Sequence, residues 1–68
     1  NPVSNMTTLS FSNNRLLNTQ AVLIDIQGKR IKQFIISNYQ EQIDMSHLPG
    51  GMYILKLDDG TAIKLIKN

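Results

Sequence analysis

The residues that could perform chemistry are few and are scattered along the chain. His47 is the only histidine and cysteine is absent, while the carboxylates share no regular spacing, at Asp25, Glu41, Asp44, Asp58 and Asp59. A zinc site needs several such ligands at matched positions. Nucleophilic catalysis needs a base beside a serine or threonine, whereas this histidine lies in a loop with Pro49. We therefore expect no metal, no cofactor and no enzymatic activity.

Two further motifs resemble ligand sites in isolation but have simpler explanations. Asp58-Asp59-Gly60 has the acidic residues of a calcium loop but lacks its further oxygen ligands and its terminal glutamate, so we predict a turn. Gly28, Gly50 and Gly51 could cradle a phosphate, but none of them opens a helix whose N-terminus would hold an anion. We interpret these glycines as turn residues.

The elements that must position these residues are short apolar runs separated by Gly, Asn, Asp and Pro, and no segment sustains a helical period. Strands are expected at residues 7–11, 20–26, 29–37, 40–45, 52–57 and 61–67, after a linker-like lead-in at residues 1–5. A small sheet must cover its apolar face with another sheet. The sequence therefore predicts one all-β domain over residues 1–68, folded as a β-sandwich.

Two turns and one strand can be predicted in more detail. At residues 25–28, Asp25 should accept backbone hydrogen bonds and Gly28 should take a positive φ. The Asp-Gly pair at residues 59–60 should supply the positive φ angles of a tight hairpin turn. The strand at residues 52–57 should pair antiparallel with residues 61–67 and turn Lys56 to solvent, while its core-facing residues should be Tyr53, Leu55 and Leu57.

Composition excludes several classes of partner. The net charge of +2 is mild, and the late lysines Lys56, Lys64 and Lys67 alternate with apolar residues, as strand residues that face solvent would. The absence of interleaved stacking aromatics argues against nucleic-acid binding. No apolar run approaches the roughly 20 residues that span a bilayer, so we expect no membrane insertion. We expect Phe11, Phe34 and Tyr53 to pack in the interior. Met45 and Met52 should fill gaps in the core, with partner binding as the alternative.

The order of four segments resembles a known family: Asn1-Pro2 at the start, then residues 22–31, residues 43–57 and residues 64–67. The most specific features are an Asp-x-x-Gly-Lys turn at residues 25–29, a Leu-Pro-Gly loop that leads into a strand containing Tyr53, and a basic-apolar ending. Over its whole length the chain resembles the type A C-terminal sorting domain of cargo exported by the type IX secretion system in Bacteroidota. Gly50 stands where that family often has alanine, a difference that we expect to be harmless.

The resemblance implies an immunoglobulin-like antiparallel β-sandwich of about seven short strands that serves as an export label. Its partners would be an N-terminally attached cargo protein, an outer-membrane type IX translocon and a sortase-like peptidase that removes the label. The cargo would be secreted or held at the cell surface after passing through the periplasm. Residues carried over as contacts for the translocon are Asp25, Gly28, Lys29, Leu48, Pro49, Gly51, Tyr53, Lys64 and Lys67.

Two alternatives stay open at this point. The residues carried over from the family could simply preserve the fold, and this holds most strongly for the glycines, Leu48 and Tyr53. The domain could instead be an accessory immunoglobulin-like module that binds carbohydrate or acts as a spacer for a secreted enzyme. A carbohydrate-binding module should expose a cluster of planar aromatic side chains, which this sequence of two Tyr, two Phe and no Trp does not favour.

Overall fold

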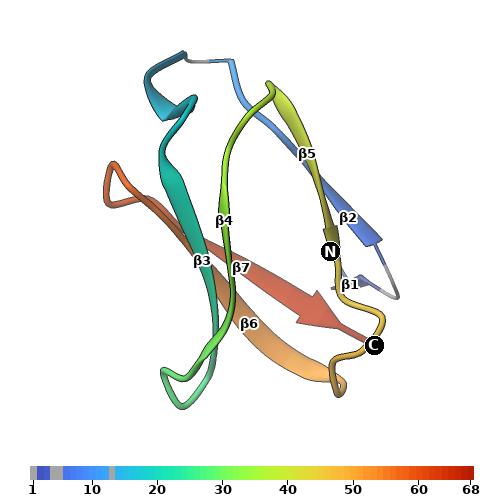
Figure 1. Cartoon of the computed structure of the whole chain (residues 1–68). Helices are drawn as coiled ribbons and strands as arrows, with labels where there is room; N and C mark the ends of the chain where they lie inside the picture. Colours follow the sequence, from blue (N-terminus) through green and yellow to red (C-terminus); the bar gives the residue numbers. More distant parts are fainter. Residues whose placement is uncertain (1, 4–5, 13) are drawn as a thin grey trace.

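The chain forms a β-sandwich of two unequal sheets. The computed structural model describes residues 2–3, 6–12 and 14–68, and these contain seven strands and one short 3₁₀ turn (Figure 1). The larger sheet has the strand order β1-β7-β6-β3-β4, and the smaller sheet pairs β2 with β5. The elements are β1 (Pro2–Val3), β2 (Met6–Ser10), η1 (Asn14–Leu16), β3 (Gln20–Asp25), β4 (Arg30–Ile35), β5 (Gln40–Asp44), β6 (Gly51–Leu57) and β7 (Ala62–Lys67).

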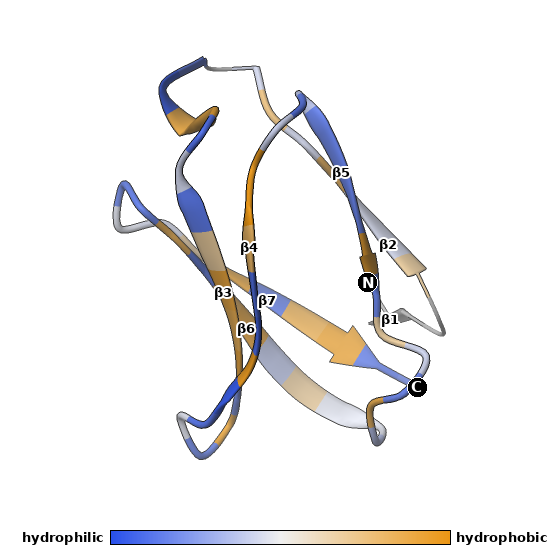
Figure 2. Cartoon of the chain, viewed as in Figure 1, coloured by the Kyte–Doolittle hydropathy of each residue, from blue (hydrophilic) through white to orange (hydrophobic). Residues whose placement is uncertain are grey.

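The core lies between the two sheets. The central strands β3 and β6 contribute Leu23 and Leu55, which are fully buried, and the smaller sheet contributes Leu9 and Ile43. Figure 2 shows apolar and polar residues alternating along several strands, as expected when one face of a sheet is covered and the other is not. The predicted β-sandwich is therefore confirmed.

The predicted register of the last hairpin is confirmed. β6 and β7 are antiparallel, with Tyr53 opposite Leu65 and Lys56 opposite Ala62. Tyr53, Leu55 and Leu57 are buried, whereas Lys56 is exposed. This alternation identifies the inner and outer faces of the larger sheet, because a shift of one residue would expose Tyr53, Leu55 and Leu57 and turn Lys56 toward the core.

The turns β3–β4 and β6–β7 have the same construction. The amide of Gly28 donates to the carbonyl of Asp25 and the amide of Gly60 donates to the carbonyl of Leu57, at 3.0 and 3.1 Å. Gly28 and Gly60 have φ values of +84° and +92°. A three-residue hairpin loop of this kind needs a left-handed residue only at its last position. The prediction for Gly28 is thus confirmed, whereas the prediction that Asp59 also takes a positive φ is wrong.

Three features differ from the sequence-based expectation. Pro2–Val3 is a strand that pairs parallel with β7, so part of the expected linker belongs to the larger sheet, and one strand pair departs from the antiparallel arrangement. The η1 turn, which buries Leu16, was not predicted because a single turn is too short to show a period. Met45 is fully buried as predicted, but Met52 is 41% exposed, so its expected place in the core is wrong.

We predict that Gly28→Val lowers the free energy of unfolding by about 1–3 kcal/mol, because a β-branched residue is strained at this φ. A Cβ at Gly28 would meet no atom within 4 Å, so the effect should come from the backbone conformation and not from a clash. Gly28→Asn is the matched control, since Asn tolerates the left-handed region better. Denaturant unfolding of both variants measures the difference, and equal stability of the two would contradict this explanation.

Candidate functional site

One end of the sandwich brings together most of the residues carried over from the sequence resemblance. β6 runs from this end, and it pairs Tyr53 with Asp25 on one side and with Leu65 on the other, while Gly51 pairs with Lys67. The β3–β4 turn and the β5–β6 loop therefore project from the same end, beside the last residues of β7 (Figure 1). We call this region, residues 25–29, 48–51, Tyr53 and Lys67, the motif end.

The β5–β6 loop is fastened to the sheet by two side chains. The hydroxyl of Tyr53 donates a 2.5 Å hydrogen bond to the carbonyl of Pro49. The ammonium of Lys67 donates a 2.6 Å hydrogen bond to the carbonyl of Leu48. Both contacts are partly buried. The bond from Lys67 has a charged donor, and such bonds stabilise more than those between neutral groups. These bonds fix the loop in one geometry relative to β6 and β7.

Gly50 allows the same loop to approach the end of β7 closely. A Cβ built at Gly50 would lie 3.2 Å from the backbone carbon of Asn68 and 3.5 Å from the carbonyl oxygen of Lys67. An alanine would fit only if Asn68 shifted by a few tenths of an ångström. The glycine thus fits the loop against the last strand, where an alanine would be tight.

The β3–β4 turn is held by the carboxylate of Asp25. Its Oδ1 accepts hydrogen bonds from the amides of Gln27 and Lys29, each at 2.9 Å. The amide of Asp25 in turn donates to the carbonyl of Lys29 at 3.0 Å. Aspartate is suited to this position because its short side chain reaches amides two and four residues further along the chain. Gly28 and Lys29 stay exposed on the outside of the turn.

The nine carried-over residues divide by what they contact. Asp25, Leu48, Tyr53 and Lys67 make contacts that hold the motif end together. Lys67 was expected to face solvent, which is wrong, because it lies on the inner face with Leu65 and is half-buried. The exposed residues are Gly28, Lys29, Pro49, Gly51 and Lys64. All but Lys64 lie at the motif end; Lys64 pairs with Ile54 on the outer face of the larger sheet.

The rest of the described structure offers no site for chemistry. His47 is exposed and its Nδ1 lies 2.9 Å from the hydroxyl of Ser46, which itself donates to Asp44. Asp44, His47 and Leu48 border an open cleft of about 280 Å³ together with Ile31 and Lys32. In residues 2–3, 6–12 and 14–68 no three His, Asp or Glu side chains are placed to hold a metal ion.

Carboxylates of Glu41 and Asp44 accept hydrogen bonds in turns. Hydrogen bonds from the backbone of Ser37, and then of Asn38, lower the pKa of Glu41. The hydroxyl and amide of Ser46 lower the pKa of Asp44. A general acid at neutral pH needs a pKa raised toward 7, so shifts in this direction do not suit that role. These carboxylates keep their charge and accept hydrogen bonds from turn amides.

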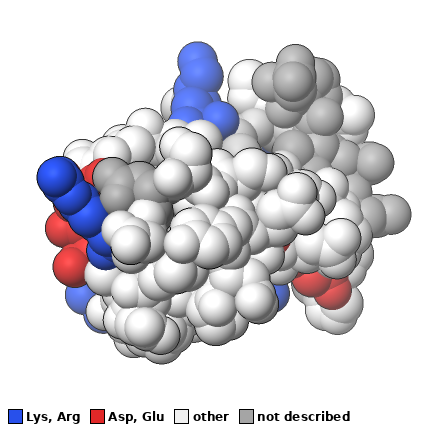
Figure 3. Space-filling view, turned by 90° about the horizontal axis from the view of Figure 1, so that it is seen from above, with Lys and Arg blue, Asp and Glu red and all other residues white. Residues whose placement is uncertain are grey.

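The described aromatic side chains offer no platform for carbohydrate. Tyr39 is the exposed aromatic residue, while Phe11 and Phe34 are half-buried and Tyr53 is buried, so these side chains form no planar platform. The end opposite the motif end shows separate positive and negative side chains without a basic stripe (Figure 3). No helix among the described residues is long and apolar enough to cross a membrane.

Sequence reasoning missed the two side-chain hydrogen bonds to the β5–β6 loop. Leu48 and Lys67 are 19 residues apart, so no local sequence pattern predicts their contact. The two residues lie close together because β7 pairs with β6 in the sheet. The bond between Tyr53 and Pro49 spans four residues and could have been proposed from a tyrosine that follows a Pro-Gly turn. Partial burial of Lys67 could have been read from its register with Leu65, since both lie on one face of the strand.

The fold is a small all-β sandwich whose two turns at the motif end are held by side-chain hydrogen bonds. A family model described as "Secretion system C-terminal sorting domain" matches residues 1–68, the whole chain. The chain therefore belongs to that family, whose members are C-terminal sorting signals for type IX secretion. No curated protein and no solved structure matches the chain. The family is one of secretion signals and not of catalysts, and its cargo is secreted or displayed at the cell surface.

We predict that Lys67→Gln destabilises the domain by about 1–2 kcal/mol, because it removes a charged donor from the partly buried carbonyl of Leu48. Lys64→Gln is the matched control: the same substitution on the same strand, at an exposed position where the change should stay within about 0.5 kcal/mol. Denaturant unfolding at neutral pH compares the two variants. Equal midpoints would show that Lys67 does not fasten the loop.

We also predict a pH dependence that includes Glu41. Its pKa is lowered from the ordinary value of 4.5 in the folded state, so its contribution to stability is present above that pH and is lost as pH falls through the folded pKa. Glu41→Gln should remove this part of the acid destabilisation, leaving the parts due to Asp44 and Asp59. Thermal unfolding from pH 7 down to acid pH measures this. An unchanged slope in the variant would contradict the assignment.

Proposed function

We propose that the domain carries an N-terminally attached cargo across the outer membrane because the type IX translocon recognises the folded motif end. The observation that carries this proposal is that three side chains fix two neighbouring turns in one geometry. The carboxylate of Asp25 accepts a hydrogen bond within the first turn, and Tyr53 and Lys67 donate hydrogen bonds to the second. Lys29 and Pro49, whose backbone groups take part in these bonds, remain exposed. A surface fixed in this way can be bound without the entropy loss of ordering a loop.

The two groups of carried-over residues would then have different roles. Asp25, Leu48, Tyr53 and Lys67 would be positioning residues, since their polar or apolar groups are already engaged within the domain. The exposed residues Gly28, Lys29, Pro49, Gly51 and Lys64 would contact the translocon. With this division, a domain with a thin core uses neighbouring residues of the same motifs for folding and for recognition.

The position of β1 supports processing at the N-terminal side. Pro2 pairs with Ile66 and Val3 pairs with Lys67, so the chain enters the sheet beside its last strand. A cargo attached on this side would connect at the edge of the larger sheet, outside the core. We propose that a sortase-like peptidase at the cell surface cleaves on this side and leaves the cargo secreted or held at the surface. The route to that point passes through the periplasm.

A fusion of residues 1–68 behind a leader peptide and a reporter should be exported across the outer membrane of a host that has the type IX machinery. Lys29→Glu combined with Pro49→Ala should reduce export by about tenfold, equivalent to ~1.4 kcal/mol of binding. These side chains are exposed, and the carbonyl of Pro49 that Tyr53 binds is kept in the variant. The measurement is reporter activity outside the cells relative to the periplasm.

Two controls distinguish a loss of recognition from a loss of folding. Cooperative melting of the purified variant must match that of the wild-type domain, so that unfolding is not mistaken for loss of recognition. Deletion of residues 64–68 should abolish export together with folding, because it removes most of β7 and exposes the edge of β6. Retention of the intact wild-type fusion in the periplasm of a competent host would overturn the proposal and favour the accessory-module alternative.

A further inference from the structure

The outer face of the larger sheet is unusually apolar for a surface that the smaller sheet does not cover. Its strands turn their alternate residues to this side, opposite the core, as the pairs Met52–Ile66 and Ile24–Ile54 show. Met52 and Ile66 are each 41% exposed, and Ile35 is 55% exposed. The apolar side chains of this face are Val22, Ile24, Ile35, Met52, Ile54 and Ile66.

The smaller sheet provides an internal comparison. Its own outer face carries the cross-strand pairs Thr8–Gln42 and Ser10–Gln40, and Met6 is the apolar exception. These polar residues are what a solvated strand face ordinarily carries. The same chain therefore has one outer face suited to water and another that is apolar over four strands. Both faces belong to one domain, so the overall amino-acid composition of the chain does not account for the difference between them.

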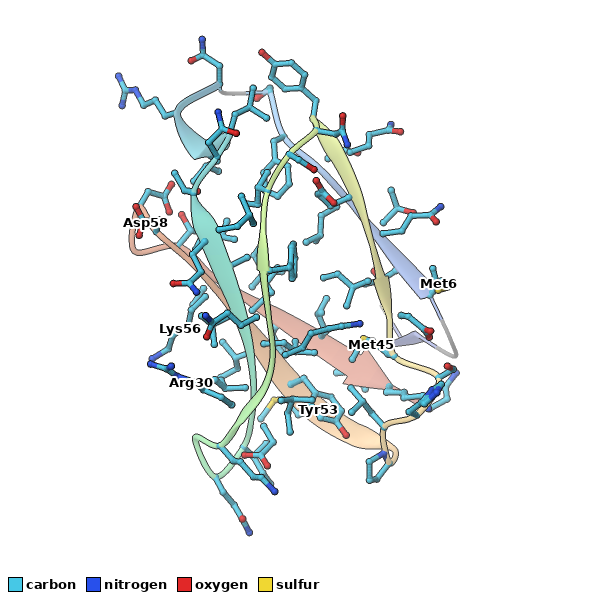
Figure 4. The ribbon with its side chains drawn as sticks, viewed as in Figure 1. Met6, Arg30, Met45, Tyr53, Lys56 and Asp58 are labelled. Carbon is cyan, nitrogen blue, oxygen red and sulfur yellow. The ribbon has the colours of Figure 1, made fainter. Side chains whose placement is uncertain are left out.

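The apolar face also has a uniform charge. Arg30, Lys56 and Lys64 are exposed and turn to this side, as their pairing with Ile24, Val22 and Ile54 shows. Figure 4 shows Arg30 and Lys56 directed away from the interior, where Tyr53 and Met45 lie. Among the described residues of the four strands, this face carries no carboxylate. Its charge is therefore positive and unpaired within the face.

We infer that this face docks on a protein surface of the export machinery that has an apolar centre and acidic residues around it. The face is defined by Met52, Ile54, Ile66, Lys56 and Lys64 and their neighbours on β3 and β4. The inference rests on the proposed function, since it names a second contact for the same partner. Lys64 belongs to the carried-over residues and lies on this face, which makes the docking surface continuous with the motif end through β7. Carboxylates of the partner placed opposite the cations would give specificity and speed of association.

Two other occupants fit the geometry less well. A second copy of the domain would bring the same cations face to face around a two-fold axis, which is unfavourable without intervening carboxylates. In a planar membrane, burial of Ile54 would also bury Lys64, its direct neighbour across the strands, or force it to reach back to the lipid headgroups. A protein surface can place acidic groups at each of these positions.

The test uses the reporter fusion with two matched pairs of variants. Lys56→Gln with Lys64→Gln lowers the net charge by two on the apolar face, and Thr8→Glu with Gln40→Glu lowers it by the same amount on the smaller sheet. Met52→Ser removes an exposed methionine from the apolar face, and Met6→Ser removes one from the smaller sheet. All variants should melt cooperatively. Export should fall about tenfold or more for the first member of each pair and stay unchanged for the second.

The outcomes separate this inference from the proposed function. Normal export of all variants, with normal export of the wild type, would overturn the docking face and the contact assigned to Lys64, and would leave sorting through the motif end intact. Retention of the wild-type fusion would overturn both. Sedimentation of the purified wild-type domain with phosphatidylglycerol vesicles, lost in the double lysine variant, would assign the face to a membrane and overturn the inference. Concentration-dependent dimers that dissociate in Met52→Ser would assign it to a second copy.

Discussion

Burial of one face of β6 is the constraint on which the rest of the structure depends. This strand pairs with β3 on one side and β7 on the other, so its register decides which residues of three strands face the core. Because Tyr53, Leu55 and Leu57 are buried, Asp25 and Lys67 are brought to the same end, and Lys56 and Lys64 are turned outward. A slip of one residue would turn Tyr53, Leu55 and Leu57 outward and Lys56 toward the core.

Folding and recognition are coupled through this constraint. A chain of this length buries only about 60% of its unfolded surface, so few residues are free to act without affecting stability. The bonds from Tyr53 and Lys67 connect the β5–β6 loop to β6 and β7, two neighbouring strands of the larger sheet. The motif end can therefore exist only in the folded domain. A translocon that binds this surface would read the fold and the motif together.

The sequence predicted the parts of the structure that depend on local pattern. Alternation in residues 52–57 and the glycine of the β3–β4 turn were sufficient, because strand faces and left-handed turns have short-range signals. It failed where the decisive contact is distant: the burial of Lys67, the strand at Pro2–Val3 and the exposure of Met52. An apolar residue such as Met52 suggests a core position, and only the full sheet shows that nothing in the described domain covers its face.

The central claim is that sorting depends on a folded surface and not on a linear signal. Equilibrium binding to the isolated outer-membrane translocon tests it most directly, comparing the purified domain with a synthetic peptide of residues 43–57, which contains the Leu-Pro-Gly motif and Tyr53 but lacks β3 and β7. The account predicts that the folded domain binds and that the peptide binds at least about a hundredfold more weakly, a difference of ~2.7 kcal/mol. Equal affinity of the peptide and the domain would contradict it.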